Sequence, residues 1–198
     1  MRRPPGLPDR LVAAIGEAVR ESGPSGVSLR DVARRAGVSH AAPAHHFGNK
    51  AGMLAAFAAE GYRQLAASVT EEIGRSACET GADQLAAVGR GYVRFAIRQP
   101  EYFEVMFRPD ALNVDLAELV EATETAYRLL VDSLARCEAE GSLAGHDPIV
   151  VGVAAWSLVH GLASLWLSGR LGERIPVSDP TELAAAVSAL FVSSVLHT

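Results

Sequence analysis

The sequence has few of the features that mark secreted, membrane or catalytic proteins. Its cysteines, Cys78 and Cys137, are too few for a disulfide framework and suit buried positions in a reducing compartment. The N-terminus lacks the apolar run of a signal peptide, and neither a glycine-rich phosphate loop nor a GxSxG elbow occurs. The adjacent acids Glu71 and Glu72 face different ways on a helix, which argues against a catalytic pair. These absences predict a cytoplasmic protein that is not an enzyme and has no cofactor.

One apolar run is long enough to cross a bilayer. Residues 149–169 read "IVVGVAAWSLVHGLASLWLSG" and contain no formal charge. The run also contains His160, two serines and two glycines before its last two residues, and no other run in the chain resembles it. A helix that is apolar all round can equally be buried between other helices or between subunits. We therefore expect no membrane contact, with a membrane-anchored protein as the alternative.

Runs that favour strands are also scarce, whereas alanine is abundant. Hydrophobic residues make up 49% of the chain and charged residues 21%, as in a globular protein. Apolar residues at helical spacing predict an all-α fold of about nine helices. We expect a three-helix domain over residues 1–50 and a helical bundle over residues 51–198. The expected helices cover about residues 8–21, 29–36, 40–46, a long stretch after residue 49, 82–98, 102–107, 116–140, 148–168 and 181–196.

The charge of the chain is unevenly distributed. Residues 1–50 hold eight arginines and lysines against four acids, a formal charge of +4. Because the whole chain carries -5, the remainder must carry about -9. A basic N-terminal segment on an acidic body suggests that only this segment meets a polyanion.

The stretch "SLRDVARRAGVSHAAPAHH" has the pattern of two short helices joined by a tight turn. Ser28 is suited to cap the first helix, and Asp31 three residues later gives an approximate capping box. The small Ala33 lets the second helix cross closely, and Gly37 suits the left-handed conformation that ends a helix. Ser39 is expected to cap the second helix. Such a helix-turn-helix places its second helix in the major groove of DNA.

Residues 8–54 resemble the DNA-binding domain of the TetR (tetracycline-repressor-like) family. The matching pieces are "VSLRDVARRAGVS" and "HHFGNKAGML". The C-terminal part resembles the subgroup whose regulatory domain carries Trp-x3-His-Gly, here Trp156, His160 and Gly161, and the string "YVRFAIRQPEYFEVMFRP" is also similar. The resemblance implies a homodimeric transcriptional regulator, most simply a repressor. It would bind a palindromic operator and be released by a small apolar ligand.

The resemblance also implies which residues meet DNA. Ser28 and Arg30, at the start of the first helix, would contact a phosphate or a base edge, and His45 would hold a phosphate. Arg2 and Arg3 would form an arm that reaches a minor groove. The full set of expected DNA-binding residues in the domain is Ser28, Arg30, Ser39, His40, Ala41, His45, His46 and Lys50.

Two positions depart from the usual family pattern. Pro43 stands where Leu or Ile is usual, and with Ser39 as the cap it would remove only the first intrahelical hydrogen bond. Ala44 stands where Tyr is usual, so one phosphate contact is expected to be weaker. These departures leave open an alternative function, a small-molecule binding protein whose DNA binding has degenerated.

The histidines and arginines of this segment also have simpler interpretations. A metal site is disfavoured, because His40 and His45 do not share one face of a helix and no Cys, Asp or Glu lies among them. His46 could be a core histidine satisfied by a backbone group. Arg34 and Arg35 could be an ordinary solvated face.

The region over residues 51–198 is expected to hold a ligand pocket and a dimer interface. Helices near 148–168 and 181–196 would form a four-helix bundle with a second copy. Trp156 and His160 are four residues apart, so plain core or dimer packing is an alternative to a pocket. The candidate ligand-binding residues are Tyr92, Phe95, Phe103, Met106, Phe107, Tyr127, Trp156 and His160.

Overall fold

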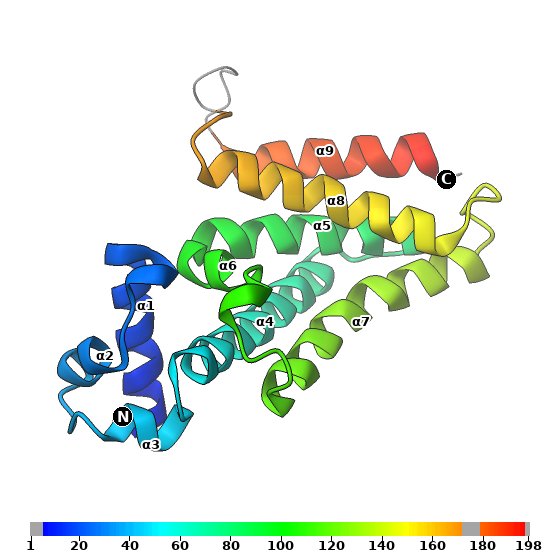
Figure 1. Cartoon of the computed structure of the whole chain (residues 1–198). Helices are drawn as coiled ribbons and strands as arrows, with labels where there is room; N and C mark the ends of the chain where they lie inside the picture. The colour runs from blue at the N-terminus through cyan, green and yellow to red at the C-terminus, as the bar shows by residue number, and fades with distance from the viewer. Residues whose placement is uncertain (1–5, 172–178, 197–198) are drawn as a thin grey trace. The chain divides into compact units, whose positions relative to one another are not determined.

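The protein is all-α, as the sequence predicts. A computed structural model describes residues 6–171 and 179–196, so the expected arm at Arg2 and Arg3 lies outside the described residues. Within these ranges the structure contains nine α-helices, one 3₁₀ turn and no strand (Figure 1). The helices are α1 Leu7–Gly26, α2 Leu29–Ala36, α3 Ala42–Phe47, α4 Lys50–Arg75, α5 Gly81–Arg98, α6 Pro100–Met106, α7 Ala117–Ala139, α8 Pro148–Leu167 and α9 Pro180–Val195, with the 3₁₀ turn Pro109–Ala111 between α6 and α7.

The chain divides into two compact units. The N-terminal unit comprises residues 6–62 and 101–123, and the C-terminal unit comprises the described residues of 63–100 and 124–198. The expected domain boundary after residue 50 coincides with the start of α4, whereas the units part within α4, after Tyr62. The N-terminal unit also takes in α6 and the first residues of α7.

The start of α2 depends on a serine cap. Ser28 has extended backbone angles, and its hydroxyl accepts a 3.2 Å hydrogen bond from the backbone N–H of Asp31. The expected capping box is wrong in its second half, because both carboxylate oxygens of Asp31 bind arginines, Arg34 and Arg35, rather than the backbone of Ser28. The ion pairs along the helix therefore take the place of the reciprocal cap.

A glycine turn ends α2 and allows α3 to follow directly. Gly37 has φ +64° and ψ +39°, and its N–H donates to the carbonyl oxygens of Ala33 and Arg34. The N–H of Val38 also donates to Ala33, at 3.0 Å. This is the left-handed ending expected from the sequence. Together, α2, the turn and α3 form a helix-turn-helix at one end of the N-terminal unit (Figure 1).

The short helix α3 starts later than expected. It begins at Ala42 rather than His40, its capping position is Ala41, and no side chain caps it, so the expectation that Ser39 caps this helix is wrong. Residues 40 and 41 form a turn, and the first α-helical bond runs from His45 N to Ala41 O at 2.9 Å. Pro43 therefore lies in the first helical turn, where an amide has no intrahelical acceptor, and it removes no bond.

Within the N-terminal unit, α6 packs closely against α1 and α4. The ring of Phe57 stacks on Tyr102 at a centroid distance of 4.1 Å. Gly61 leaves room for α6, since a Cβ there would lie 2.7 Å from the sulfur of Met106. Arg20 Nη2 pairs with Glu101 Oε1 at 2.6 Å, which links α1 to the start of α6. These contacts explain why residues after 100 belong to the same unit as the helix-turn-helix.

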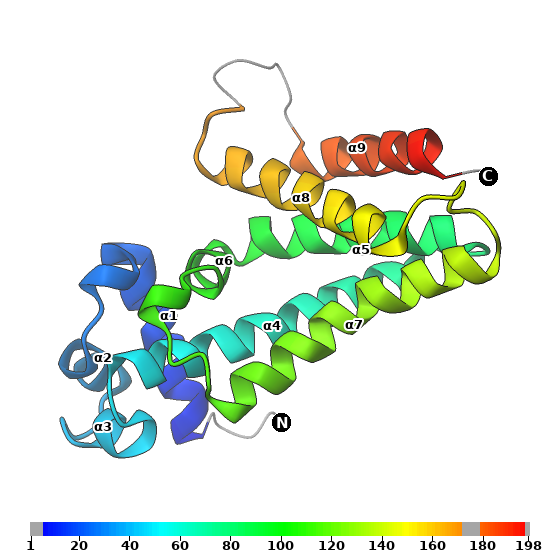
Figure 2. The same cartoon turned by 45° about the vertical axis from the view of Figure 1, so that its right-hand side comes forward.

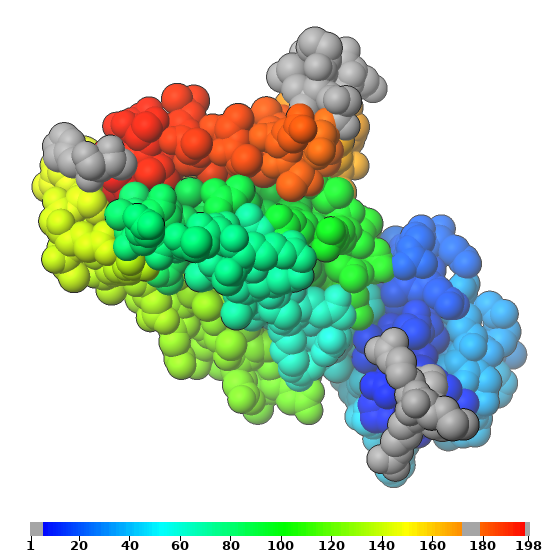
Figure 3. Space-filling model, turned by 180° about the vertical axis from the view of Figure 1, so that it is seen from behind, coloured from blue at the N-terminus to red at the C-terminus, as the bar shows by residue number. Residues whose placement is uncertain are grey.

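The C-terminal unit is a helical bundle around α5. Its core joins α5, α7, α8 and α9 through buried Leu85, Leu134, Cys137, Val151 and Val192. Figures 1 and 2 both show α8 and α9 side by side over α5, and Figure 3 shows α9 (orange to red) lying along α5 (green). One side of α8 and α9 is therefore buried in this core, while Ile149 and Val153 of α8 and Leu190 of α9 are exposed.

The helices α5, α8 and α9 start at side-chain caps. Thr80 Oγ1 accepts from Asp83 N at 3.1 Å, and the Asp83 carboxylate reaches back to the Thr80 N–H, a full capping box. Asp147 and Asp179 cap α8 and α9, each followed by a proline at the first helical position. These local signals account for the close match between expected and observed helix starts.

Candidate nucleic-acid interface

The α2–turn–α3 segment presents a polar surface to solvent. Of the eight residues expected to bind DNA, seven are exposed: Ser28, Arg30, Ser39, His40, Ala41, His45 and His46; Lys50 is half-buried. The interpretation of His46 as a core histidine is wrong, because its side chain is exposed and its ring packs against the neighbouring Phe47 ring at a centroid distance of 4.6 Å. The core side of the segment is apolar instead, with Val32, Ala33, Ala36 and Pro43 buried.

Two of the arginines on α2 are bound by carboxylates. Arg34 Nη2 pairs with Asp31 Oδ1 at 2.5 Å, while Arg35 Nε pairs with Asp31 Oδ2 at 2.6 Å. Arg35 also forms a bidentate ion pair with Glu21 of α1: Nη2 donates to Oε2 at 2.5 Å and Nη1 donates to Oε1 at 3.0 Å. The Arg35 side chain is only 15% exposed, so the interpretation as an ordinary solvated face does not hold for it. This four-residue ion cluster has no net formal charge.

The ion cluster shifts the protonation of its members. Hydrogen bonds from Arg35 and then Arg34 lower the pKa of Asp31, and the hydrogen bond from Arg35 lowers the pKa of Glu21. The same contacts with Glu21 and Asp31 raise the pKa of Arg35. These shifts keep Glu21, Asp31 and Arg35 charged at neutral pH.

Two other cations lie at the edges of this surface. Lys50 Nζ donates to the carbonyl oxygen of Ser25 at 2.6 Å, which fixes the start of α4 beside the end of α1. Arg30 is exposed and makes no hydrogen bond or ion pair with the described residues. Arg30 is thus free to meet a phosphate or a base edge without breaking a contact.

The candidate ligand-binding residues are spread over both units. Phe103, Met106 and Phe107 belong to the N-terminal unit, where Phe103 and Phe107 lie 5.1 Å apart. The others belong to the C-terminal unit, in which Tyr127 on α7 is 55% exposed and Trp156 on α8 is 43% exposed.

Two of these residues, on α5 and α8, form a polar contact inside the C-terminal unit. The Tyr92 hydroxyl lies 2.8 Å from His160 Nδ1, and Phe95 is buried one turn further along α5. Burial lowers the pKa of His160, which favours the neutral ring. The phenol hydroxyl and the Nδ1 atom of a neutral imidazole can therefore share one hydrogen bond.

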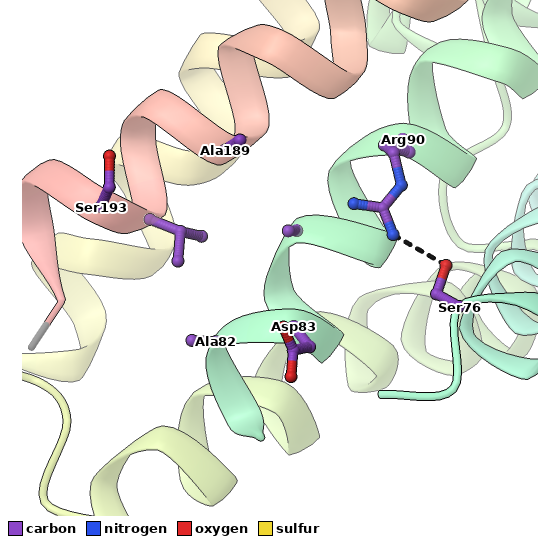
Figure 4. A pocket seen from close by; sticks show the side chains of 8 residues that line it. Ser76, Ala82, Asp83, Arg90, Ala189 and Ser193 are labelled. Atoms are coloured by element: carbon purple, nitrogen blue, oxygen red, sulfur yellow. Dashed lines mark hydrogen bonds between the residues drawn. The ribbon is translucent and has the colours of Figure 1, made fainter. Parts of the chain in front are cut away.

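A small hollow in the C-terminal unit has a different lining. It holds about 250 Å³ and lies between α5 and α9, beside the end of α4 (Figure 4). Arg90 Nη2 donates to Ser76 Oγ at 2.7 Å on its wall. None of the eight candidate ligand-binding residues lines it. Its lining is Ser76, Ala82, Asp83, Ala86, Arg90, Ala189, Val192 and Ser193.

A buried ion bridge joins α4 to α5 next to this hollow. Glu72 is 8% exposed at its side chain, accepts from Arg90 Nε at 2.9 Å and also pairs with Arg94. Burial alone would raise the pKa of Glu72, but Arg90 and Arg94 outweigh it and hold this pKa below its ordinary value. Sequence reasoning missed this bridge, although the four-residue spacing of Arg90 and Arg94 places both on one face of α5.

A broad apolar surface lies on α8 and α9. On α8, Ile149, Val150 and Val153 are 75%, 63% and 56% exposed, and Leu190 on α9 is 67% exposed. Among the described residues, α8 is the helix whose length and composition would allow it to cross a membrane, a test that core helices of soluble proteins also pass. Patches of this kind mark surfaces that another molecule covers.

Comparison with protein families identifies the chain. A model described as "Bacterial regulatory proteins, tetR family" matches residues 11–57, and "Tetracyclin repressor-like, C-terminal domain" matches residues 85–191. The chain belongs to the TetR family. Members of this family are regulators of transcription that bind DNA, typically act as dimers with small-molecule ligands, and are generally not enzymes.

Solved structures share the fold of this TetR-family regulator. A protein of unknown function from Rhodococcus sp. RHA1 is 27% identical with a TM-score of 0.81, over 99% of this chain and 100% of that one. The TetR-family regulator PfmR from Thermus thermophilus is 20% identical with a TM-score of 0.72, over 93% and 98%. A tetR-family regulatory protein from Rhodococcus RHA1 is 19% identical with a TM-score of 0.75, over 96% and 97%. A search of curated proteins finds no match.

Proposed function

We propose that this protein is a cytoplasmic transcriptional repressor that binds a palindromic operator as a homodimer. The observation that carries the proposal is the exposed helix-turn-helix, whose short helix α3 carries the exposed His45 and His46 and whose first helix α2 carries the exposed Arg30. Its second helix would enter the major groove, and the two heads of a dimer would meet half-sites about one helical turn apart. Residues 1–50 would form the DNA-binding domain and residues 51–198 the ligand-binding and dimerisation domain.

Some residues of the interface would contact base edges, and others would contact the phosphate backbone. Arg30 and His40 would meet base edges or nearby phosphates, and His45 and His46 would meet the backbone. Lys50 already donates to Ser25, and an ammonium has two further N–H donors for a phosphate. Ser28 already accepts from Asp31 N, but its exposed hydroxyl still has a proton to donate.

Replacing Arg30 with alanine should change which sequences are preferred, whereas Lys50→Ala should weaken all sequences about equally. A lost base contact costs about 1–3 kcal/mol at one position, and a lost phosphate contact lowers the salt dependence of binding. Binding of both variants to a panel of single-base operator variants, at several salt concentrations, measures this. If Lys50→Ala altered only the preferred sequence, the two roles would be wrongly assigned.

We infer that the apolar surface of α8 and α9 faces a second copy of the chain rather than lipid. Two helices from each copy would form a four-helix bundle, a common way to cover apolar helix faces. The exposed Ile149, Val153 and Leu190 would then be buried in the dimer. The single apolar helix needs no bilayer in this arrangement.

The ligand would be a small apolar molecule bound in the C-terminal domain. Tyr92 and His160 would provide a polar anchor among the aromatic candidates, as most ligand pockets combine apolar walls with a few polar groups. We assign this domain to the Trp-x3-His-Gly subgroup through Trp156, His160 and Gly161. A ligand that favours the non-binding state by about 1–3 kcal/mol would be enough to release DNA.

A small-molecule binding protein with degenerate DNA binding remains the second candidate. One observation favours it: Ala44 is exposed on α3 and has no hydroxyl to offer a phosphate. A gel-shift with DNA from upstream of the gene distinguishes the two, because only the repressor retards that DNA at low salt.

A further inference from the structure

We propose that this regulator takes up protons when it binds DNA, because His40 in the turn before α3 and His45 and His46 on α3 are the side chains of this segment that can carry positive charge. The inference rests on the proposed function and concerns how DNA binding is regulated. It predicts a protein whose affinity for DNA rises as the pH falls through the range in which histidine titrates. No arginine or lysine lies on α3 or in the turn before it.

The three histidines of this segment are open to solvent. All three side chains are exposed, and none makes a hydrogen bond or ion pair with the described residues. Asp31 is the only acid between residues 28 and 59, and both of its oxygens already bind arginines. In the free protein no carboxylate of α2, α3 or the first part of α4 is therefore available to these side chains.

The fixed cations around α3 are largely committed elsewhere. Arg34 and Arg35 of α2 belong to the neutral cluster with Asp31 and Glu21, and Lys50 at the start of α4 is bound to a backbone carbonyl. No other charged residue occurs on α4 before Glu60. The remaining charged groups of the neighbouring helices are Arg30 on α2 and Asp9, Arg10, Glu17 and Arg20 on α1, of which Arg20 pairs with Glu101.

The sign of the effect follows from proton linkage. Phosphates next to an imidazole favour its charged form, so the DNA-bound protein holds more protons than the free protein. Histidine is the side chain whose charge ordinarily changes between about pH 5 and 8. The extra affinity is therefore fully present in mild acid and is lost as the pH rises through the range in which the bound imidazoliums lose their protons. Uptake of one proton corresponds to about a tenfold change per pH unit.

The test measures binding of the full-length protein to a labelled random-sequence duplex of about 24 base pairs, which spans two half-sites. At constant ionic strength, wild-type affinity should be about tenfold higher near pH 6 than near pH 8. A variant with His40→Gln, His45→Gln and His46→Gln should lose most of this rise. His146→Gln is the matched control, because His146 is equally exposed in the loop before α8, and it should keep the rise.

A second measurement needs no variant. Calorimetric titration of the wild-type protein with the same duplex, in two buffers of different ionisation enthalpy, reports protons taken up per DNA bound. Uptake of about one proton or more near pH 6.5 supports the proposal. Zero uptake, or a pH dependence that survives in the triple variant, overturns it. Absence of DNA binding at every pH instead contradicts the proposed function itself, so the two failures are distinguishable.

Discussion

Replacing Val153 with arginine is expected to produce monomers and to weaken operator binding about a hundredfold or more. Val153 is 56% exposed on α8, on the side opposite the buried Val151 and Ala155. In the proposed four-helix bundle an arginine there would be buried without a partner, which costs several kcal/mol at the interface. A monomer has one helix-turn-helix, so it loses the increase in DNA affinity, about 10²–10⁴-fold, that two linked binding domains provide.

A matched variant separates this effect from a general effect of surface charge. Val131 on α7 is 42% exposed in the same unit, and Val131→Arg is expected to leave dimer and operator affinity unchanged. Light scattering coupled to gel filtration gives the oligomeric state, and fluorescence anisotropy gives the affinity. A Val153→Arg protein that remains dimeric and binds the operator normally would show that the dimer forms elsewhere.

Glu72→Ala is expected to lower the free energy of unfolding by about 3–5 kcal/mol. The change removes the only carboxylate that pairs with Arg90 and Arg94 among the described residues and leaves two guanidinium groups partly buried. Removing one partner of a buried ion pair costs more than the pair itself contributes, because the remaining charge is still desolvated. Urea unfolding at neutral pH measures the loss.

Glu71→Ala is the matched control for this prediction. Glu71 precedes Glu72, is 51% exposed and pairs only with Arg75 in the described contacts, so its loss should cost about 0.5 kcal/mol or less.

The stabilising effect of Glu72 should also depend on pH. Because the pKa of Glu72 is held below its ordinary value, its contribution to the free energy of unfolding is fully present above the ordinary carboxyl range. This contribution is lost as the pH falls through the lowered pKa of Glu72. The difference between wild type and Glu72→Ala should therefore shrink in acid; a constant difference would contradict the role of the ion bridge.

The helix-turn-helix could be predicted because its signals are local. Ser28 and Gly37 set the two ends of α2, and the expected range 29–36 agrees with the structure. The start of α3 could not be predicted in the same way. Ser39 has the chemistry of a cap, but the chain makes one more turn at residues 40 and 41 before the helix begins. Local propensity identified the helix and misplaced its first residues.

The ion contacts of the site depend on tertiary structure and were therefore not predicted. Glu21 and Arg35 are 14 residues apart and meet only because α1 and α2 pack together. Glu72 was considered only with its neighbour Glu71, and its true partners lie on α5. The prediction that the two acids face different ways is confirmed, since one is exposed and the other buried. The sequence did not reveal that the buried acid, Glu72, links α4 to α5 through its ion pairs.

The ligand-binding candidates illustrate a limit of choosing residues by type. Phe103 and Met106 are buried against the N-terminal unit, while Tyr127 and Trp156 are exposed in the C-terminal unit. Aromatic residues at helical spacing look alike whether they fill a core, line a pocket or cover a dimer interface. The contact between Tyr92 and His160 is the detail that only the fold could supply, because it joins positions 68 residues apart.

The central claim is that two exposed helix-turn-helix heads read one stretch of DNA. Selection of sequences bound by the full-length protein from a random duplex pool tests it most directly. The account predicts an enriched palindrome whose half-sites are centred about 10 base pairs, or a multiple of this, apart. Enrichment of a single unpaired site, or no enrichment after repeated rounds at low salt, would contradict it.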